Sequence, residues 1–227
     1  MLAAKARPGI TTEELDAAAE KFIRSQGAEP AFKGYRGFPG SICASPNSMV
    51  VHGIPDAYEL KRGDVIAIDV GVVKDGWVSD AATTLPIGPV SPEAQKLLDV
   101  TKGSLFAGVE EMRPGNHLGD VSAAIQRAVE TEGMSIIRTL VGHGIGRDMH
   151  EEPQVPNFGE SGKGPELEAG MVLAIEPMVN VGGPLVRMGD DGWAVYSDDG
   201  SLAAHLEFTV AVTPDGPRIL TPWHEDD

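Results

Sequence analysis

The chain is poor in cysteine, in basic residues and in long apolar runs. Its single cysteine, Cys43, excludes an intramolecular disulfide and is typical of a reducing compartment. There are 18 Lys and Arg residues against 34 Asp and Glu, a formal charge of -16. This balance argues against a nucleic-acid binder, because such proteins present a basic face to phosphates. No run of about 18 apolar residues and no apolar signal segment occurs. We therefore expect a cytoplasmic protein with no direct contact to membranes or nucleic acid.

A weak internal repeat runs through the 227 residues. The tripeptide Arg-Pro-Gly opens a segment with helical spacing of apolar residues at 7–27 and again at 113–133. A second echo relates residues 63–69 to residues 170–176, at nearly the same offset. Because a solenoid needs more copies at a shorter period, the repeat predicts two related halves, each a helix followed by antiparallel strands. We expect one domain over 1–227, with halves at about 1–90 and 91–227.

The two halves differ in what precedes the repeat. Ser91-Pro92 is a good helix start, and apolar residues continue at helical spacing to Val109. Only six residues precede the first Arg-Pro-Gly. We therefore expect the first half to lack most of the corresponding helix.

Residues 65–85 favour a β-hairpin with Asp75-Gly76 as its turn. A two-residue turn places Asp69 opposite Ala82 and puts Asp80 on the same face, close enough to share a cation. A three-residue turn would put the two acids on opposite faces. Asp80 would then be a turn residue or a solvated charge at the sheet edge.

Three other polar residues interrupt apolar or glycine-rich segments. His143 lies among three glycines in a segment that weakens both helix and strand, so we expect a shaped loop or a bulged strand end there. Glu176 and Glu207 each lie inside an apolar run predicted to be a strand, without Lys or Arg in the run. An ionised carboxylate in such a place is costly unless it is paired or binds metal.

These patterns single out four acids and one imidazole as possible metal ligands. Four carboxylates balance two divalent cations, and mixed oxygen and nitrogen ligation suits Mn, Fe, Co or Zn better than a thiolate metal. A dinuclear hydrolytic site is the interpretation, although a lone histidine such as His143 is also common in cores and on surfaces. The predicted ligands are Asp69, Asp80, His143, Glu176 and Glu207.

From residue 7 to about residue 220 the chain resembles the type I methionine aminopeptidases, which are peptidases of the pita-bread fold. The resemblance implies an α+β fold of two pseudo-symmetric halves around a curved antiparallel sheet covered by helices, in agreement with the repeat. It also implies that the usual N-terminal helix is truncated. The matching motifs are Val51-His-Gly-Ile-Pro55, Ile68-Asp-Val70 followed by Asp80, Gly142-His-Gly-Ile-Gly146, His150-Glu-Glu-Pro-Gln-Val155, Ile175-Glu-Pro-Met-Val-Asn180 and Glu207-Phe-Thr209.

The resemblance also implies roles for the predicted ligands. Asp69 holds one of two divalent ions (Co, Mn, Fe, Zn or Ni), and His143 and Glu176 hold the other. Asp80 and Glu207 bridge the two ions. The water between them loses its proton near neutral pH and supplies hydroxide as the nucleophile, while Glu176 handles that proton.

Outside the ligand set, the resemblance implies substrate contacts. His52 is expected near the N-terminal amine and the leaving nitrogen, and His150 at the scissile carbonyl, although His52 could be an ordinary turn residue. A pocket for the methionine side chain is expected to contain aromatic and sulfur-bearing residues, each of which could equally be ordinary core. Cys43 lacks the paired base of a nucleophile. The pocket residues are Tyr35, Phe38, Cys43, Met149 and Trp193, with Phe32 nearby.

The chain departs from the family pattern near the expected site. Val78 and Arg36 stand where His is frequent, and Ala81 and Ala82 replace the usual Thr-Ser. Phe208 replaces a common His. The loss of hydroxyl and imidazole groups around the ligands is expected to alter metal affinity and preference.

The resemblance implies an enzyme that removes the initiator methionine from nascent chains when the next residue is small. It also implies a monomer that meets the ribosome only transiently. Two alternatives stay open: a related peptidase that cleaves Xaa-Pro bonds, and a pita-bread module that has lost catalysis and binds a partner. The intact ligand set counts against the second alternative, whereas the altered residues around it keep it open.

Overall fold

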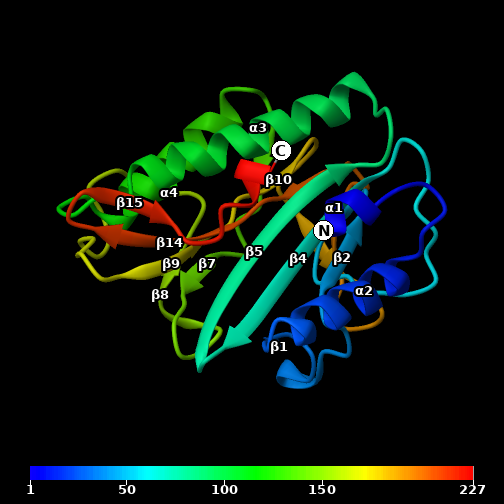
Figure 1. The fold of residues 1–227 in the computed structure, drawn as a ribbon. Helices are drawn as coiled ribbons and strands as arrows, with labels where there is room; N and C mark the ends of the chain where they lie inside the picture. The colour runs from blue at the N-terminus through cyan, green and yellow to red at the C-terminus, as the bar shows by residue number, and fades with distance from the viewer. Residues whose placement is uncertain (227) are drawn as a thin grey trace.

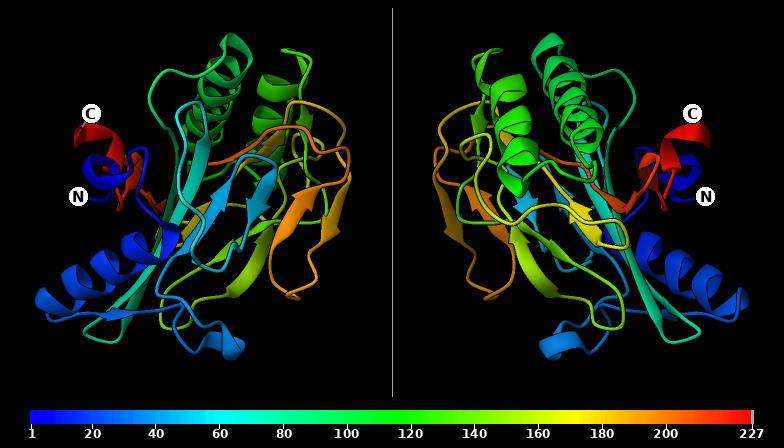
Figure 2. Two further views of the ribbon diagram at one scale, coloured as in Figure 1. Left: turned by 90° about the vertical axis from the view of Figure 1, so that its right-hand side faces the viewer. Right: turned by 90° about the vertical axis from the view of Figure 1, so that its left-hand side faces the viewer.

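A computed structural model describes residues 1–226 of the chain. A long β-hairpin crosses the middle of the molecule (Figure 1). One long helix, α2 (Thr12–Ser25), lies beside this hairpin, and two others, α3 (Pro92–Glu110) and α4 (Leu118–Glu130), lie along the top of the view. Figure 2 shows that pair lying together above the strands. A short helix, α1 (Leu2–Lys5), precedes them, and there are short 3-10 turns η1 (Tyr35–Gly37) and η2 (Trp223–Asp226).

Side-chain caps mark the starts of α2 and α3, the second of them at the predicted Ser91-Pro92 helix start. The Thr11 side chain accepts from the Glu14 backbone N–H, and Glu14 reciprocates in a capping box at the start of α2. Ser91 caps α3 ahead of Pro92 in the first turn. The helices predicted in the two halves are thus confirmed. One apolar residue of the helical pattern in α2, Phe22, is nevertheless 47% exposed.

The strands form four sheets, of four, five, three and three strands. The first contains the β4–β5 hairpin, with β1 and β2 on the other edge of β4. It comprises β1 (Glu29–Pro30), β2 (Cys43–Pro46), β4 (Val65–Lys74) and β5 (Trp77–Pro86). The largest has the order β15-β14-β9-β7-β8. It comprises β7 (Gly142–Gly144), β8 (Glu151–Val155), β9 (Val172–Ile175), β14 (Phe208–Thr213) and β15 (Gly216–Ile219).

Two three-stranded sheets complete the structure between these larger ones. One contains β6 (Ser135–Ile136), β10 (Met178–Asn180) and β13 (Ala203–His205); the other contains β3 (Met49–Val51), β11 (Val186–Met188) and β12 (Val195–Ser197). Pairing is antiparallel throughout the described ladders. This α+β arrangement of helix-covered antiparallel sheets is the predicted fold class.

The apolar core lies on the helix side of the sheets. Leu105 of α3, Ile125 of α4 and Phe208 of β14 are fully buried in the largest cluster. A second cluster packs Leu15 of α2 against Ile66 of β4. The other face of β4 is therefore available to polar residues of the interior. In the part of the chain that the structure describes, no helix has the length and apolar character to cross a membrane.

Two strands predicted as continuous are interrupted at their acidic residues. Glu176 and Pro177 separate β9 from β10, and Leu206 and Glu207 separate β13 from β14. In each case the chain leaves one sheet and enters another. Pro177 has no N–H to donate to a ladder, which favours the first break. The prediction of two acids inside regular strands was therefore wrong, and both acids lie where the chain crosses between sheets.

Candidate active site

The β4–β5 hairpin brings Asp69 and Asp80 to one face. Its turn is Asp75-Gly76, with φ of 53° and 76°, and the ladder pairs Asp69 with Ala82 and Gly71 with Asp80. The predicted two-residue turn and register are thereby confirmed. Thr209 on β14 fixes the backbone of Asp80, because its hydroxyl accepts from Asp80 N at 3.0 Å and donates to Asp80 O at 2.7 Å.

His143 lies on β7, where the pairing with β8 shifts register. This is the bulged strand end that the glycine-rich segment predicts. A Cβ on Gly142 would lie 2.3 Å from Ala174 O, so only glycine allows the backbones to approach this closely. His143 Nδ1 lies 2.9 Å from Gly144 O. Because a carbonyl can only accept, Nδ1 carries the ring proton and Nε2 is left free to bind a ligand.

Glu176 and Glu207 enter the site from the two sheet crossings. The crossing at Glu207 is tied to the hairpin, since Glu207 N donates to Ala82 O at 2.8 Å. Glu176 Oε1 lies 3.6 Å from His143 Nε2. The structure therefore brings the five predicted ligands together from β4, β5, β7 and the two crossings.

A sixth residue, His205, was not predicted to belong to the site. It ends β13, is 2% exposed, and its Nε2 lies 3.6 Å from Glu176 Oε2. Thr84 holds its backbone, donating to His205 O at 2.8 Å and accepting from His205 N at 2.9 Å. The signal in the sequence is its position two residues before Glu207, inside the same apolar run.

Burial dominates the electrostatics of the carboxylates. It raises the pKa of Asp80 and of Glu176 to about 7 in each case, with the charge of Glu176 adding to the effect on Asp80. Burial, followed by the charge of Asp80, raises the pKa of Asp69 and of Glu207 well above the usual range. The four acids therefore oppose one another's ionisation and need positive charge to be held as carboxylates.

The donor atoms fit a divalent cation. Ligand atoms of Asp80, His143 and Glu207 all lie within 4.8 Å of one another. Asp69 Oδ1 and Glu207 Oε1 are buried and have no hydrogen-bond partner among the described residues. Orphaned oxygens beside imidazole nitrogens form the mixed donor set that suits Mn, Fe, Co or Zn. The arrangement is therefore able to hold metal.

A cavity of about 310 Å³ opens beside the carboxylates. Its apolar wall includes Phe38, whose ring packs edge-on against Phe32 and Trp193 at centroid distances of 6.5 Å and 5.2 Å. Of the predicted pocket residues, Tyr35, Phe38, Cys43 and Trp193 line the cavity, as does Phe32. Met149 is buried in the same apolar cluster but is not among the lining residues.

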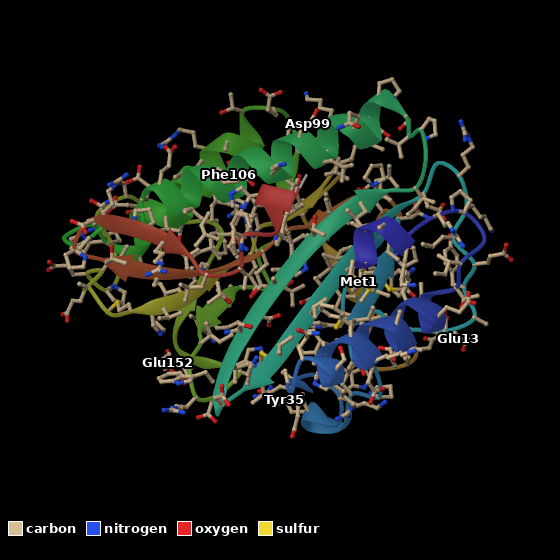
Figure 3. The ribbon with its side chains drawn as sticks, viewed as in Figure 1. Met1, Glu13, Tyr35, Asp99, Phe106 and Glu152 are labelled. Atoms are coloured by element: carbon tan, nitrogen blue, oxygen red, sulfur yellow. The ribbon has the colours of Figure 1, made fainter. Side chains whose placement is uncertain are left out.

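His52 and His150 lie on the cavity wall together with the acids. His52 has φ of 59°, a left-handed conformation that is uncommon for a residue other than glycine. His150 Nδ1 is hydrogen-bonded to the Tyr35 hydroxyl at 2.8 Å, and the two rings are stacked. In Figure 3 Tyr35 lies on η1 near the hairpin turn, and Glu152 of β8 lies on the other side of that turn.

The departures from the family pattern fall into two groups. Phe208 is fully buried in the core against Phe106 and Trp223, so its ring serves packing. Val78 and Ala82 are on the hairpin, and Ala82 lies directly opposite Asp69. At these two positions the side chains are apolar, so the hydrogen-bonding support of the acids comes from elsewhere, such as Thr209.

Four converging acids, two imidazoles and an apolar cavity on this α+β fold define the class of metal-dependent hydrolases. The model of metallopeptidase family M24 matches residues 1–214. A methionine aminopeptidase from Clostridium perfringens is 56% identical over 221 residues, covering 97% of this chain and 89% of that relative. The chain therefore belongs to metallopeptidase family M24, and within it to the methionine aminopeptidases.

Solved structures agree with this assignment. A methionine aminopeptidase from Rickettsia prowazekii superposes with a TM-score of 0.96 at 41% identity, covering 97% of this chain and 89% of that chain. A prolidase from Pyrococcus furiosus reaches a TM-score of 0.76 at 23% identity, covering 96% and 59%. The second likeness shows the shared fold alone. The pita-bread fold expected from the resemblance is confirmed.

Proposed function

We propose that the chain hydrolyses the peptide bond after an N-terminal methionine when the second residue is small. The observation that carries this proposal is a cluster of four carboxylates beside an aromatic cavity, in a chain with close methionine aminopeptidase relatives. Three of the carboxylates are buried, and the fourth, that of Glu176, is partly exposed. The cavity is of a size for one amino-acid side chain and its immediate neighbours.

Two divalent ions are proposed to bind the carboxylate cluster. Asp69 would hold one ion, His143 and Glu176 the other, and Asp80 and Glu207 would bridge them. When bound, divalent cations lower the pKa of water to near neutrality and supply hydroxide as the nucleophile. Unpartnered buried oxygens on Asp69 and Glu207 support this assignment, whereas the identity of the metal is left to experiment among Co, Mn, Fe, Zn and Ni.

The protein's own residues would position the substrate and move protons. With the Tyr35 hydroxyl donating to Nδ1, neutral His150 carries its proton on Nε2 and can donate to the scissile carbonyl oxygen. His52 would contact the substrate amine and the leaving nitrogen. Glu176, which lies beside His143 at the edge of the cluster, would accept the proton of the attacking water and return it to the leaving group.

Methionine specificity would come from the aromatic wall of the cavity. Phe38, Trp193 and Tyr35 offer ring faces and edges to a polarizable thioether, with the Cys43 sulfur alongside. Burial raises the pKa of the Cys43 thiol well above its usual range, so it acts as a small apolar group there. Met149 does not line the cavity and would support its wall through the apolar cluster that it shares with Phe32.

We also propose that residues 1–227 act as one catalytic domain, as a monomer in the cytoplasm. Its substrates would be nascent polypeptides, met during transient encounters with the ribosome. The acidic composition supports the absence of direct nucleic-acid binding.

The test is hydrolysis of Met-Ala-Ser, Ala-Pro-Ala and N-acetylated Met-Ala-Ser, with chelator and with added Mn, Co or Fe. Release of methionine from the first peptide alone, lost with chelator and restored by cation, is the expected result.

A variant of the carboxylate cluster adds a second test. Asp80→Asn should abolish turnover, and Asp215→Asn, in the exposed β14–β15 turn, is the matched control. Metal-dependent cleavage of Ala-Pro-Ala alone would favour an Xaa-Pro peptidase. Cation binding without any cleavage would favour a binding module.

A further inference from the structure

His205 is buried beside the carboxylate cluster, on the wall of the cavity, and among the described residues its imidazole ring makes no hydrogen bond. Its exposed fraction is 2%, and neither Nδ1 nor Nε2 has a hydrogen-bond partner among the described residues. A buried polar group that makes no hydrogen bond destabilises the fold. A buried imidazole with two unsatisfied nitrogens therefore needs a partner from outside the chain.

The ring nitrogen Nε2 faces two carboxylates at distances suited to a shared cation. It lies 3.6 Å from Glu176 Oε2 and 4.0 Å from Glu207 Oε2, too far for a hydrogen bond. Two donors that are each about 2.0–2.2 Å from a tetrahedral cation lie roughly 3.4 Å apart. The shorter separation is therefore close to that between neighbouring ligands of one ion.

Glu176 presents one oxygen to each of two imidazoles. Its Oε1 lies 3.6 Å from His143 Nε2, and its Oε2 lies the same distance from His205 Nε2. The position of His205 is set by its backbone, which Thr84 holds through two hydrogen bonds. The ring is therefore directed at the cluster by the strand rather than by bonds of its own.

We propose that His205 Nε2 is a further ligand of the divalent cation held by Glu176 and Glu207. The centre then has two imidazole donors instead of one. This inference rests on the proposed function, because it requires that cations bind the cluster. Imidazole donors favour Zn, Co and Ni over Mn, so the second imidazole shifts the metal preference in that direction.

The proposal is tested with His205→Gln and His205→Leu, and with His117→Gln at the partly exposed start of α4 as the matched control. Chelator-stripped proteins are titrated calorimetrically with Zn²⁺ and with Mn²⁺, and the visible spectrum of the Co²⁺ form is recorded. Both His205 variants should lose at least about tenfold in Zn²⁺ affinity, lose less for Mn²⁺, and show shifted Co²⁺ bands. The control should match the parent.

Folding of the variants is checked by thermal unfolding without metal. His205→Leu should be at least as stable as the parent, because it removes an unpartnered buried imidazole, and His205→Gln should be close to the parent, because it exchanges one buried polar group for another. Should a variant fail to fold, anomalous diffraction from the Zn²⁺-loaded parent decides. Zinc about 2.0–2.1 Å from Nε2 supports the proposal, and zinc more than about 3 Å away overturns it.

The outcomes separate this inference from the proposed function. Equal Zn²⁺ affinity and equal Co²⁺ spectra in parent and His205→Gln would overturn the inference and leave the function standing. Loss in His205→Leu but not in His205→Gln would also overturn it, because an amide would then suffice. A parent protein that binds no cation would overturn both.

Discussion

Removal of metal should make the stability of this protein fall steeply between acidic and neutral pH. In the metal-free fold, burial raises the pKa of Asp80 and of Glu176 to about 7 from ordinary values of 3.8 and 4.5. The unfolded chain releases these protons near pH 4, whereas the folded chain retains them to about pH 7. As pH rises through this interval the unfolded state binds fewer protons, so the free energy of unfolding decreases.

The magnitude follows from the size of the pKa change. Each of the two groups destabilises the metal-free fold by on the order of 3 kcal/mol once pH exceeds 7. Asp69 and Glu207, whose pKa values are raised further, keep their protons in the fold throughout this interval, so they add to the fall and extend it to higher pH. Since a domain is typically stable by about 5–15 kcal/mol, the loss is a large fraction of the total.

The assay is thermal unfolding at pH 5.5 and pH 8 with chelator, and again with saturating Mn²⁺ or Co²⁺. The melting temperature of the metal-free protein should fall between the two pH values, and the gain from cation should be larger at pH 8. High salt screens the exposed charges of this acidic chain but not the buried groups, so the fall should persist in salt. The double variant Asp80→Asn, Glu176→Gln should lose part of it, because burial still keeps Asp69 and Glu207 protonated in the fold. Equal stability at both pH values, or an unchanged fall in the double variant, would refute the reasoning.

Three substitutions test other parts of the site. Tyr35→Phe removes the hydroxyl beside His150 Nδ1, so kcat for Met-Ala-Ser should fall several-fold with little change in KM. Phe38→Ala should raise KM for methionine peptides and cost about 3–5 kcal/mol of stability in denaturant unfolding, because a 4% exposed ring is lost. Gly142→Ala places a Cβ 2.3 Å from Ala174 O, so this variant should melt several degrees lower and bind Co²⁺ more weakly in titration. A variant that matches the parent in these measurements would contradict the role given to that residue.

Local patterns in the sequence were enough to predict the hairpin and the helices. The Asp75-Gly76 dipeptide supplies positive φ at both turn positions and so fixes the register that places Asp69 and Asp80 on one face. The caps at Thr11 and Ser91 fix where α2 and α3 begin. These features depend on neighbours within a few residues, which is why they can be predicted without the fold.

The crossings at Glu176 and Glu207 could not be predicted from periodicity. An apolar run has the same pattern whether it stays in one sheet or passes into another, and the difference is decided by distant partners such as Ala82.

The exposed position of Phe22 in α2 also could not be predicted from periodicity. Its helical spacing matches that of Leu15 and Ile23, yet it is 47% exposed, because contact with the rest of the fold decides which face of a helix is covered.

The omission of His205 has a similar cause. An imidazole inside an apolar run is most often a satisfied core residue, and only the fold shows that neither ring nitrogen has a partner among the described residues. The five predicted ligands came from acids whose charge is costly in apolar segments, together with one glycine-flanked imidazole. That reasoning detects charged groups more readily than neutral ones such as His205.

The most direct test of the central claim is anomalous diffraction from crystals of the Co²⁺-loaded protein, recorded at the cobalt edge. Two cobalt peaks about 3.5–4 Å apart are expected, enclosed by the predicted ligands Asp69, Asp80, His143, Glu176 and Glu207. Cobalt bound only to surface acids, in a protein that still releases methionine, would contradict that claim.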